Sequence, residues 1–485
     1  MKHWKKYMAL FLVAVNILSM TACSAEEEIV HKDNEIAAEN PLSPEEDKEM
    51  PMEDDTKEAD KEVKEQQKNN TAESLVKAVY PEMVQYPVTD GITMEQDAYQ
   101  SWKASLAAQR PENEEYKNGI REFYESTMQE FLSDTMGKNR VYSPLNVYMA
   151  LAMLAETTDG ESRQQILDLL GSESIEELRN NACILWNANY CDDGTVTSLL
   201  ASSAWLSDSI NYNKDTLQAL ADYYYASSFS GTMGSNEYNK MLQDWLNEQT
   251  GGLLEEQASK VEMDPATILA LATTVYFRAK WENEFNEANN TEELFHAPSG
   301  DKKIEFMHQT RTDNYYWGEN FGAISRGLEN SGEMVLILPD EDVTAESLLS
   351  DKEVQDFIYD GYAWENKKFL IVNQSIPKFD VVSDFSLIEG LKKLGVTDVF
   401  SFSESDFTPL TTDTGVAIDE AKHAARVMID EEGCIAAAFT VMLAYGAARP
   451  PEEQMDFILD RPFLFVIKGQ DNQPLFIGIV NNPKE

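Results

Sequence analysis

The sequence predicts an α+β protein built as one large domain. Leucine-rich stretches with helical spacing come first along the chain, and stretches with the composition of strands follow. No internal repeat and no linker-like stretch interrupts the chain after residue 116. Helices that precede a run of alternating strands are typical of helices packed on large, mostly antiparallel sheets.

The expected elements follow from these local patterns. Leucines and other apolar residues three and four positions apart predict helices, because such positions share one helix face. Short runs of β-branched and aromatic residues predict strands, because they fit a pleated surface. The expected helices cover residues 120–131, 147–156, 163–170, 217–225 and 241–249. The expected strands cover residues 269–277, 334–338, 370–372, 463–468 and 475–480.

Composition excludes several classes of protein. The 485 residues include 39 Lys and Arg against 86 Asp and Glu, a formal net charge of −47. Such a charge repels phosphate backbones, so nucleic acid is excluded as a partner. An apolar content of 42% with 10% aromatic residues is too high for a wholly disordered chain, and four cysteines are too few for a disulfide scaffold.

The first 22 residues are typical of a targeting signal. Three lysines among the first six residues form a basic region, and the apolar run at 8–18 is too short to span a bilayer. Residues 20–23 (Met-Thr-Ala-Cys) resemble the lipobox of bacterial lipoproteins, although Met20 stands where leucine is usual. We therefore expect a lipoprotein signal peptide at 1–22 and acylation of Cys23, which places the protein outside the cell membrane on a lipid anchor. Plain secretion into the extracellular space is the alternative.

An acidic tether is expected to follow the signal. Residues 23–74 are rich in Glu, Asp and Lys with almost no aromatic residues, so they cannot bury enough apolar surface to fold. A like-charged spacer of this kind repels itself and extends. Residues 75–115 are then expected to form an N-terminal extension, and residues 116–485 the main domain.

Sequence motifs of enzymes and metal sites are missing from the chain. There is no G-x-S-x-G, H-E-x-x-H or C-x-x-C pattern and no phosphate-binding glycine loop. An S-x-x-K string at 375–378 contains Pro377, which prevents the helical turn that would bring Ser and Lys together. The histidines of the main domain, His296, His308 and His423, have no second ligand at metal spacing. We therefore expect no enzyme activity, no metal site and no cofactor.

The most informative segment lies near the C-terminus. An acidic run and Gly433 precede residues 434–448, which contain no charge and no proline. The segment is too short for a transmembrane helix, and its alternate positions from Cys434 to Ala444 are small or slender. A chain with this alternation can slide between two strands as a new central strand, because no charge or proline blocks its inward face.

This segment and further motifs between residues 116 and 483 resemble the serpins, a family of suicide inhibitors of serine and cysteine proteases. The motifs occur in the order of the family: VYSPLN at 141–146, TTVYFRAKW at 273–281, IPKF at 376–379, LKKLGV at 391–396, DF at 406–407, His423, and RPFLF at 461–465. The resemblance implies one serpin-like domain with an exposed reactive loop. A protease would cut this loop and become acylated, and the loop would then insert into the main sheet and trap the enzyme.

The resemblance also assigns roles to individual residues. The hinge of the loop would comprise Glu431, Gly433, Cys434, Ala436, Ala437 and Ala438. The region where the sheet opens would contain Ser143, Asn146, His423 and Trp281.

Four positions depart from the family pattern. Thr273 replaces an asparagine, Ala279 replaces a glycine, Cys434 replaces the usual Thr or Ser, and Phe439 interrupts the small residues of the hinge. The first three are small replacements, and Phe439 falls on the outward face, so we expect insertion to remain allowed.

The spacing usual in the family places the cleaved bond between Ala447 and Ala448, fourteen residues after the hinge glycine. A small residue before the cut favours elastase-like or subtilisin-like serine proteases as targets. Tyr445 and Arg449 remain alternatives, which would favour chymotrypsin-like and trypsin-like enzymes.

Further expectations concern partners and cysteines. We expect a monomer that contacts the membrane through its lipid anchor alone. A non-inhibitory lipoprotein that binds a ligand with the same fold is the alternative function. Whether Cys183 and Cys191 pair stays open, and Cys434 is expected to be solvent-exposed and free.

Overall fold

The structure, a computed structural model, describes residues 72–87, 96–109, 116–434 and 451–484. The chain separates into two units, residues 1–70 and 71–485, and all described residues belong to the second unit. The signal peptide, Cys23 and most of the expected tether therefore lie outside the described residues.

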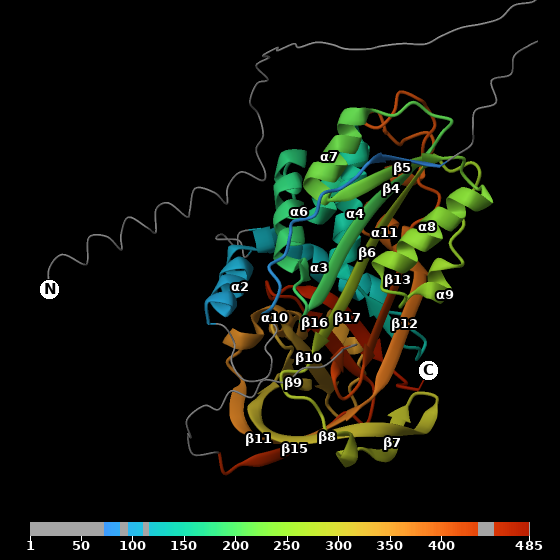
Figure 1. Ribbon diagram of the computed structural model, residues 1–485. Coiled ribbons are helices and arrows are strands. Elements are labelled where there is room, and N and C mark those ends of the chain that lie inside the picture. Colours follow the sequence, from blue (N-terminus) through green and yellow to red (C-terminus); the bar gives the residue numbers. More distant parts are fainter. Residues whose placement is uncertain (1–71, 88–95, 110–115, 435–450, 485) are drawn as a thin grey trace, which may run out of the picture. The chain divides into compact units, whose positions relative to one another are not determined.

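Helices occupy mainly the first half of this unit (Figure 1). All five expected helices are confirmed, and each begins earlier than expected. At α4, α7 and α8 a polar side chain caps the start. Ser143, for example, caps α4, and its hydroxyl accepts a hydrogen bond from the amide of Asn146. The helices are α2 (Gln96–Gln109), α3 (Tyr116–Leu132), α4 (Pro144–Thr157), α5 (Gly160–Leu170), α6 (Ile175–Asn189), α7 (Lys214–Tyr224), α8 (Asn236–Gln249), α9 (Glu255–Ala258), α10 (Lys352–Asp360) and α11 (Ile388–Lys393).

Strands dominate the second half, and the five expected strands are confirmed. Several further strands lie among the helices in sequence. The strands are β1 (Glu73–Val76), β2 (Arg140–Tyr142), β3 (Cys191–Asp192), β4 (Thr197–Ser207), β5 (Ala226–Gly231), β6 (Leu269–Lys280), β7 (Thr291–Ala297), β8 (Gly300–Trp317), β9 (Phe321–Gly327), β10 (Glu333–Pro339), β11 (Lys367–Pro377), β12 (Phe379–Ser386), β13 (Lys422–Ile429), β14 (Gly433–Cys434), β15 (Gln454–Ile458), β16 (Phe463–Lys468) and β17 (Pro474–Val480).

These strands form three sheets within the described residues. The first sheet has the order β1-β5-β4-β6-β14, with β3 attached to β4, and the second has the order β15-β11-β8-β9-β10-β16-β17-β2, with β7 attached to β8. β12 and β13 form the third as an antiparallel pair. Most pairs are antiparallel, as expected, and β4 with β5 and β11 with β15 are the parallel pairs among them.

The N-terminal boundary differs from the expectation. The tether was expected to reach residue 74, but Glu73 and Ser74 already lie in β1, which pairs antiparallel with the edge strand β5. Further along, the ring of Tyr80 packs 5.4 Å from the ring of Trp186 on α6. The segment 72–87 is therefore part of the folded unit and covers an edge of the first sheet.

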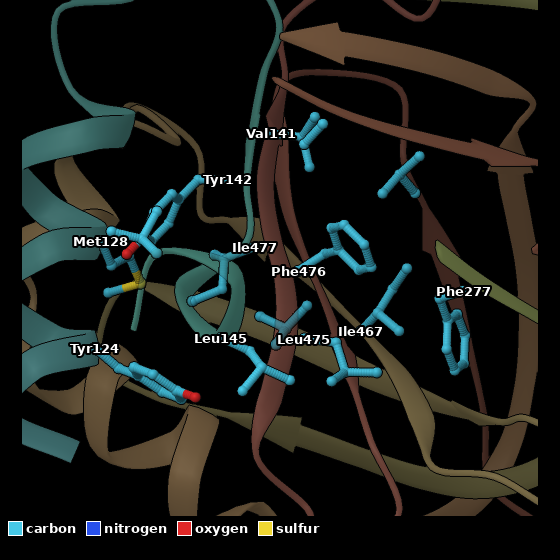
Figure 2. Close-up of a cluster of buried hydrophobic side chains, with 14 of the residues drawn as sticks. Tyr124, Met128, Val141, Tyr142, Leu145, Phe277, Ile467, Leu475, Phe476 and Ile477 are labelled. Carbon is cyan, nitrogen blue, oxygen red and sulfur yellow. The ribbon is translucent and has the colours of Figure 1, made fainter. Parts of the chain in front are cut away.

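The hydrophobic core fixes the start of α4 (Figure 2). Tyr124 of α3 and Leu145 of α4 are fully buried, as are Tyr142 of β2 and Ile477 of β17, and these two strands pair at that point. Because Leu145 lies in this core, the neighbouring polar residues at the first turn of α4 have a defined position beneath the strands that form the candidate site.

Candidate functional site

The described part of the hinge is residues 430–434, in which residues 430–432 connect β13 to the short strand β14. β14 runs antiparallel to the end of β6, with Gly433 opposite Lys280 and Cys434 opposite Ala279. A side chain at position 433 would not fit, because a Cβ atom there would lie 2.4 Å from the carbonyl oxygen of Ala279, and the φ angle of Gly433 is 155°. The need for glycine at this position of the hinge thus has a steric basis.

A turn after β6 holds the hinge in place. In this anchor turn, residues 281–285, the amide of Trp281 donates to the carbonyl of Glu432 and the amide of Phe285 donates to the carbonyl of Glu431, both at 2.9 Å. The indole nitrogen of Trp281 also donates to the carbonyl of Asp430 at 2.9 Å. Trp281 therefore lies where it was expected, against the start of the loop, and binds the hinge twice.

An ion pair connects Glu431 to the junction between β11 and β12. The Nζ of Lys378, between β11 and β12, lies 2.6 Å from Oε1 of Glu431, and the amide of Asn290 donates to the same carboxylate. Partial burial alone would raise the pKa of Glu431, but the hydrogen bonds from Lys378 and Asn290 outweigh it and hold this pKa below its usual value. Lys378 also contacts Glu305 at 3.2 Å.

Beyond the hinge, β6 and β13 do not pair. The edge of β6 that faces away from β4 has β14 as its strand partner within the described residues, and β13 pairs with β12. We call the space between β6 and β13 the slot. It contains a cavity of about 250 Å³, lined by apolar residues of β6, β13, α4 and α8, among them Leu269, Leu271, Val147, Leu246 and Ala424. In Figure 1, α4 and α8 flank β6 next to this region.

The first turn of α4 connects both sides of the slot. The amide of Ser143 donates to Nε2 of His423 on β13 at 3.1 Å. On the other side, Nδ2 of Asn146 donates to the carbonyl of Thr273 on β6 at 3.0 Å, and the Thr273 hydroxyl donates to Oδ1 of Asn146 at 2.6 Å. The structure thus brings Ser143, Asn146 and His423 together, and Thr273 completes the group.

His423 is neutral in this position. Its side chain is buried, and desolvation lowers its pKa to about 4. A neutral imidazole presents one nitrogen as an acceptor, which is what the donating amide of Ser143 requires.

The expectation for Cys434 is wrong. We expected a solvent-exposed thiol, but only 3% of Cys434 is exposed, because it already occupies a place in the sheet beside Ala279. Burial raises the pKa of this thiol well above its usual value, which makes it a poor nucleophile. Within the described part of the chain, Cys183, Cys191 and Cys434 form no disulfide.

Several expected site residues cannot be placed. Ala436, Ala437, Ala438, Tyr445, Ala447, Ala448 and Arg449 lie outside the described residues, as does Cys23. Among the residues that are described, no group of three His, Cys, Asp or Glu side chains has the geometry to hold a metal ion. None of the helices in the described ranges is long and apolar enough to cross a bilayer.

Sequence reasoning missed Lys378, Phe285 and Asn290 as hinge contacts. Lys378 lies in the IPKF motif at 376–379, but the hinge partners of all three residues are distant in sequence, so local spacing carries no signal of these contacts.

Comparison with known proteins decides the family. A family model described as "Serpin (serine protease inhibitor)" matches residues 118–483. The chain belongs to the serpin family. It is 27% identical over 367 residues to a plasma serine protease inhibitor of Mus musculus, and the aligned region covers 73% of this chain and 87% of that protein. It is 28% identical over 356 residues to the leukocyte elastase inhibitor of Homo sapiens, with 71% of this chain and 93% of that protein covered.

A solved structure agrees with this assignment. The thermophilic serpin tengpin in its native state superposes with a TM-score of 0.68 at 28% sequence identity, covering 77% of this chain and 95% of that chain. The expected serpin family and the expected α+β fold are therefore confirmed. Serpins are protease inhibitors rather than enzymes, and membership supports protease inhibition as the general function.

Proposed function

We propose that this serpin is a suicide inhibitor of serine endopeptidases that traps its target by inserting the cleaved loop into the slot between β6 and β13. The observation that carries the proposal is the position of the hinge. Gly433 and Cys434 already pair with the end of β6, while the remainder of its edge toward β13 has no strand partner among the described residues. A strand continuing from Cys434 would extend this pairing along β6.

The free energy of such an insertion is large enough to distort a protease. β6 is 12 residues long, of which two pair with β14. Roughly ten new ladder hydrogen bonds at about 1 kcal/mol each contribute on the order of 10 kcal/mol, before any apolar burial. Removal of a single oxyanion-hole donor costs a protease about 3 kcal/mol, so the insertion exceeds what is needed to stop deacylation.

The loop sequence suits this role. Residues 435–448 carry no charge, and their inward positions are small or slender. Apolar residues of β6, α4 and α8 line much of the slot, beside charged residues such as Lys260, Asp384 and Lys422. An uncharged strand that enters it buries no unpaired charge of its own.

We propose an elastase-like or subtilisin-like target. The support is the small residue Ala447 before the expected cut and the relation to an inhibitor named for leukocyte elastase. We further propose that the protein acts as a monomer outside the cell membrane, held there by lipid on Cys23.

The test is to mix the purified protein with elastase, subtilisin, chymotrypsin and trypsin and to separate the products in SDS. We expect a covalent complex with elastase or subtilisin, and release of a C-terminal peptide that starts at Ala448. Cleavage by every protease without a complex would refute inhibition and favour the alternative, a non-inhibitory ligand-binding lipoprotein. A peptide that starts after Tyr445 or Arg449 would move the cleaved bond and the target class.

A further inference from the structure

A buried arginine lies behind the anchor turn. Arg326, on β9, is only 1% exposed and forms no ion pair with any described carboxylate within 4.0 Å. Burial lowers its pKa to about 9, so it still carries its charge at neutral pH. A buried charge without a counter-ion is costly, so its polar and aromatic contacts must compensate.

These contacts converge on the anchor turn, residues 281–285. The guanidinium carbon of Arg326 lies 4.0 Å from the ring centre of Phe285 and 5.1 Å from that of Trp281. Its Nη2 donates to the carbonyl of Asn283 at 2.6 Å. Three of the five residues in the turn thus contact this one side chain.

Two glutamines extend the contact. Nη1 of Arg326 donates to Oε1 of Gln309 at 3.0 Å, and Nε2 of Gln309 donates to the carbonyl of Glu284 in the anchor turn at 3.0 Å. Nη1 also donates to Oε1 of Gln374 on β11. Gln374 lies opposite Phe457 of β15, the strand that follows the reactive loop.

Arg326 therefore connects both attachments of the reactive loop. On one side it packs on Trp281 and Phe285, whose amides bind the hinge. On the other side it binds β11, with which β15 pairs.

We propose that Arg326 is a positioning residue for loop insertion. It holds the anchor turn against the second sheet, so that the end of β6 meets the hinge and the first pairs, Gly433 with Lys280 and Cys434 with Ala279, form before cleavage. The inference rests on the proposed trapping mechanism and names the residue that sets its starting geometry. In an acylated complex, insertion competes with hydrolysis of the acyl bond, so a displaced anchor turn should let more protease escape.

The test compares Arg326→Met and Arg326→Lys with the wild-type protein. Hydrogen exchange of the peptide containing the amides of Trp281 and Phe285 should accelerate by about tenfold in Arg326→Met, because the hydrogen bonds to a charged group that fix this turn are lost. The amount of inhibitor consumed per protease should rise by about threefold, while the second-order rate of loop recognition stays unchanged. Arg326→Lys keeps a cation over the two rings and should restore part of both losses.

A matched control is Arg179→Met. Arg179 on α6 also packs over a ring, that of Tyr223 at 5.1 Å, and pairs with Glu156, but its described contacts do not include the hinge. This variant should leave both readouts at wild-type values. Gln309→Leu is a milder second variant, which removes the bridge to Glu284 and one acceptor of the Arg326 guanidinium but keeps Arg326 itself, and it should shift both readouts in the same direction.

The outcomes separate the two proposals. If the wild-type protein forms no complex, the proposed function fails, and hydrogen exchange still decides whether Arg326 holds the anchor turn. Unchanged exchange in both Arg326→Met and Gln309→Leu would overturn the inference. So would an unchanged stoichiometry in a protein that does form complexes, or no restoration by Arg326→Lys.

Discussion

The ion pair between Glu431 and Lys378 should fix the hinge to the junction between β11 and β12, and its loss should lower the free energy of unfolding by a measurable amount. The two side chains are 16% and 29% exposed and their charged atoms are 2.6 Å apart. A hydrogen bond between charged groups contributes about 1.5–3 kcal/mol when buried, and partial exposure to solvent reduces this to about 1 kcal/mol. A double-mutant cycle with Glu431→Gln and Lys378→Met should therefore give a coupling free energy of about 1 kcal/mol in urea unfolding near neutral pH.

The same pair should depend on pH with a defined sign. The pKa of Glu431 is lowered in the folded protein, so the pair stabilises the fold above the pKa of an unfolded glutamate. The coupling should disappear as the pH falls below the pKa of an unfolded glutamate and through the lowered pKa of Glu431. Lys303→Met, which breaks the well-exposed pair with Glu292, serves as a control and should have a much smaller effect. A coupling near zero at neutral pH, or one that persists in acid, would refute this reasoning.

Three further predictions concern the slot and its surroundings. Cys434→Asp places a carboxylate at a buried position, so it should lower the unfolding free energy by about 3 kcal/mol and abolish the SDS-stable complex. Cys434→Ser should retain the complex. A complex with the Asp variant would contradict the buried position of this residue. Tyr80→Ala removes the ring that packs on Trp186, so it should lower the free energy of unfolding by about 2 kcal/mol in thermal or urea unfolding. An unchanged free energy would mean that residues 72–87 do not stabilise the fold. His423 binds its proton more weakly in the fold than in the unfolded chain, so stability should fall by about 3 kcal/mol as the pH decreases from above 6.5 to about 4, and His423→Gln should remove this dependence.

The need for glycine at position 433 was predictable because its signal is local. Gly433 is needed where the backbone passes Ala279, and the absence of charge after it is visible in the sequence itself. The helices and the main strands were also predictable, since their apolar spacing reflects burial on one face. Their starts were not, because the caps at Ser143 and similar residues depend on short side-chain bonds.

Contacts between distant segments escape this kind of prediction. Lys378 and Glu431 are far apart in sequence. In the sequence, Arg326 cannot be distinguished from a surface arginine, because its burial depends on the position of β9 behind the anchor turn. β1 was missed for the same reason: Glu73–Val76 is a polar, short strand whose partner, β5, lies far along the chain. The exposure of Cys434 was wrong because burial there is decided by β6 and not by the loop sequence.

The first turn of α4 holds the two sides of the slot in place in a way that is compatible with the proposed insertion. Ser143 binds His423 on β13 and Asn146 binds Thr273 on β6, so one helix end determines the positions of both strands. These are neutral hydrogen bonds that contribute about 1 kcal/mol each, whereas a new strand in the slot contributes on the order of 10 kcal/mol. The first turn of α4 thus provides enough attachment to define the uninserted arrangement, and under the proposed mechanism it would be too weak to resist a cleaved loop. An apolar contact of the same area would not fix the positions of β6 and β13, and an ion pair at this buried position would add a desolvation penalty. Short neutral side chains therefore suit a position where, under the proposed mechanism, the two strands separate once.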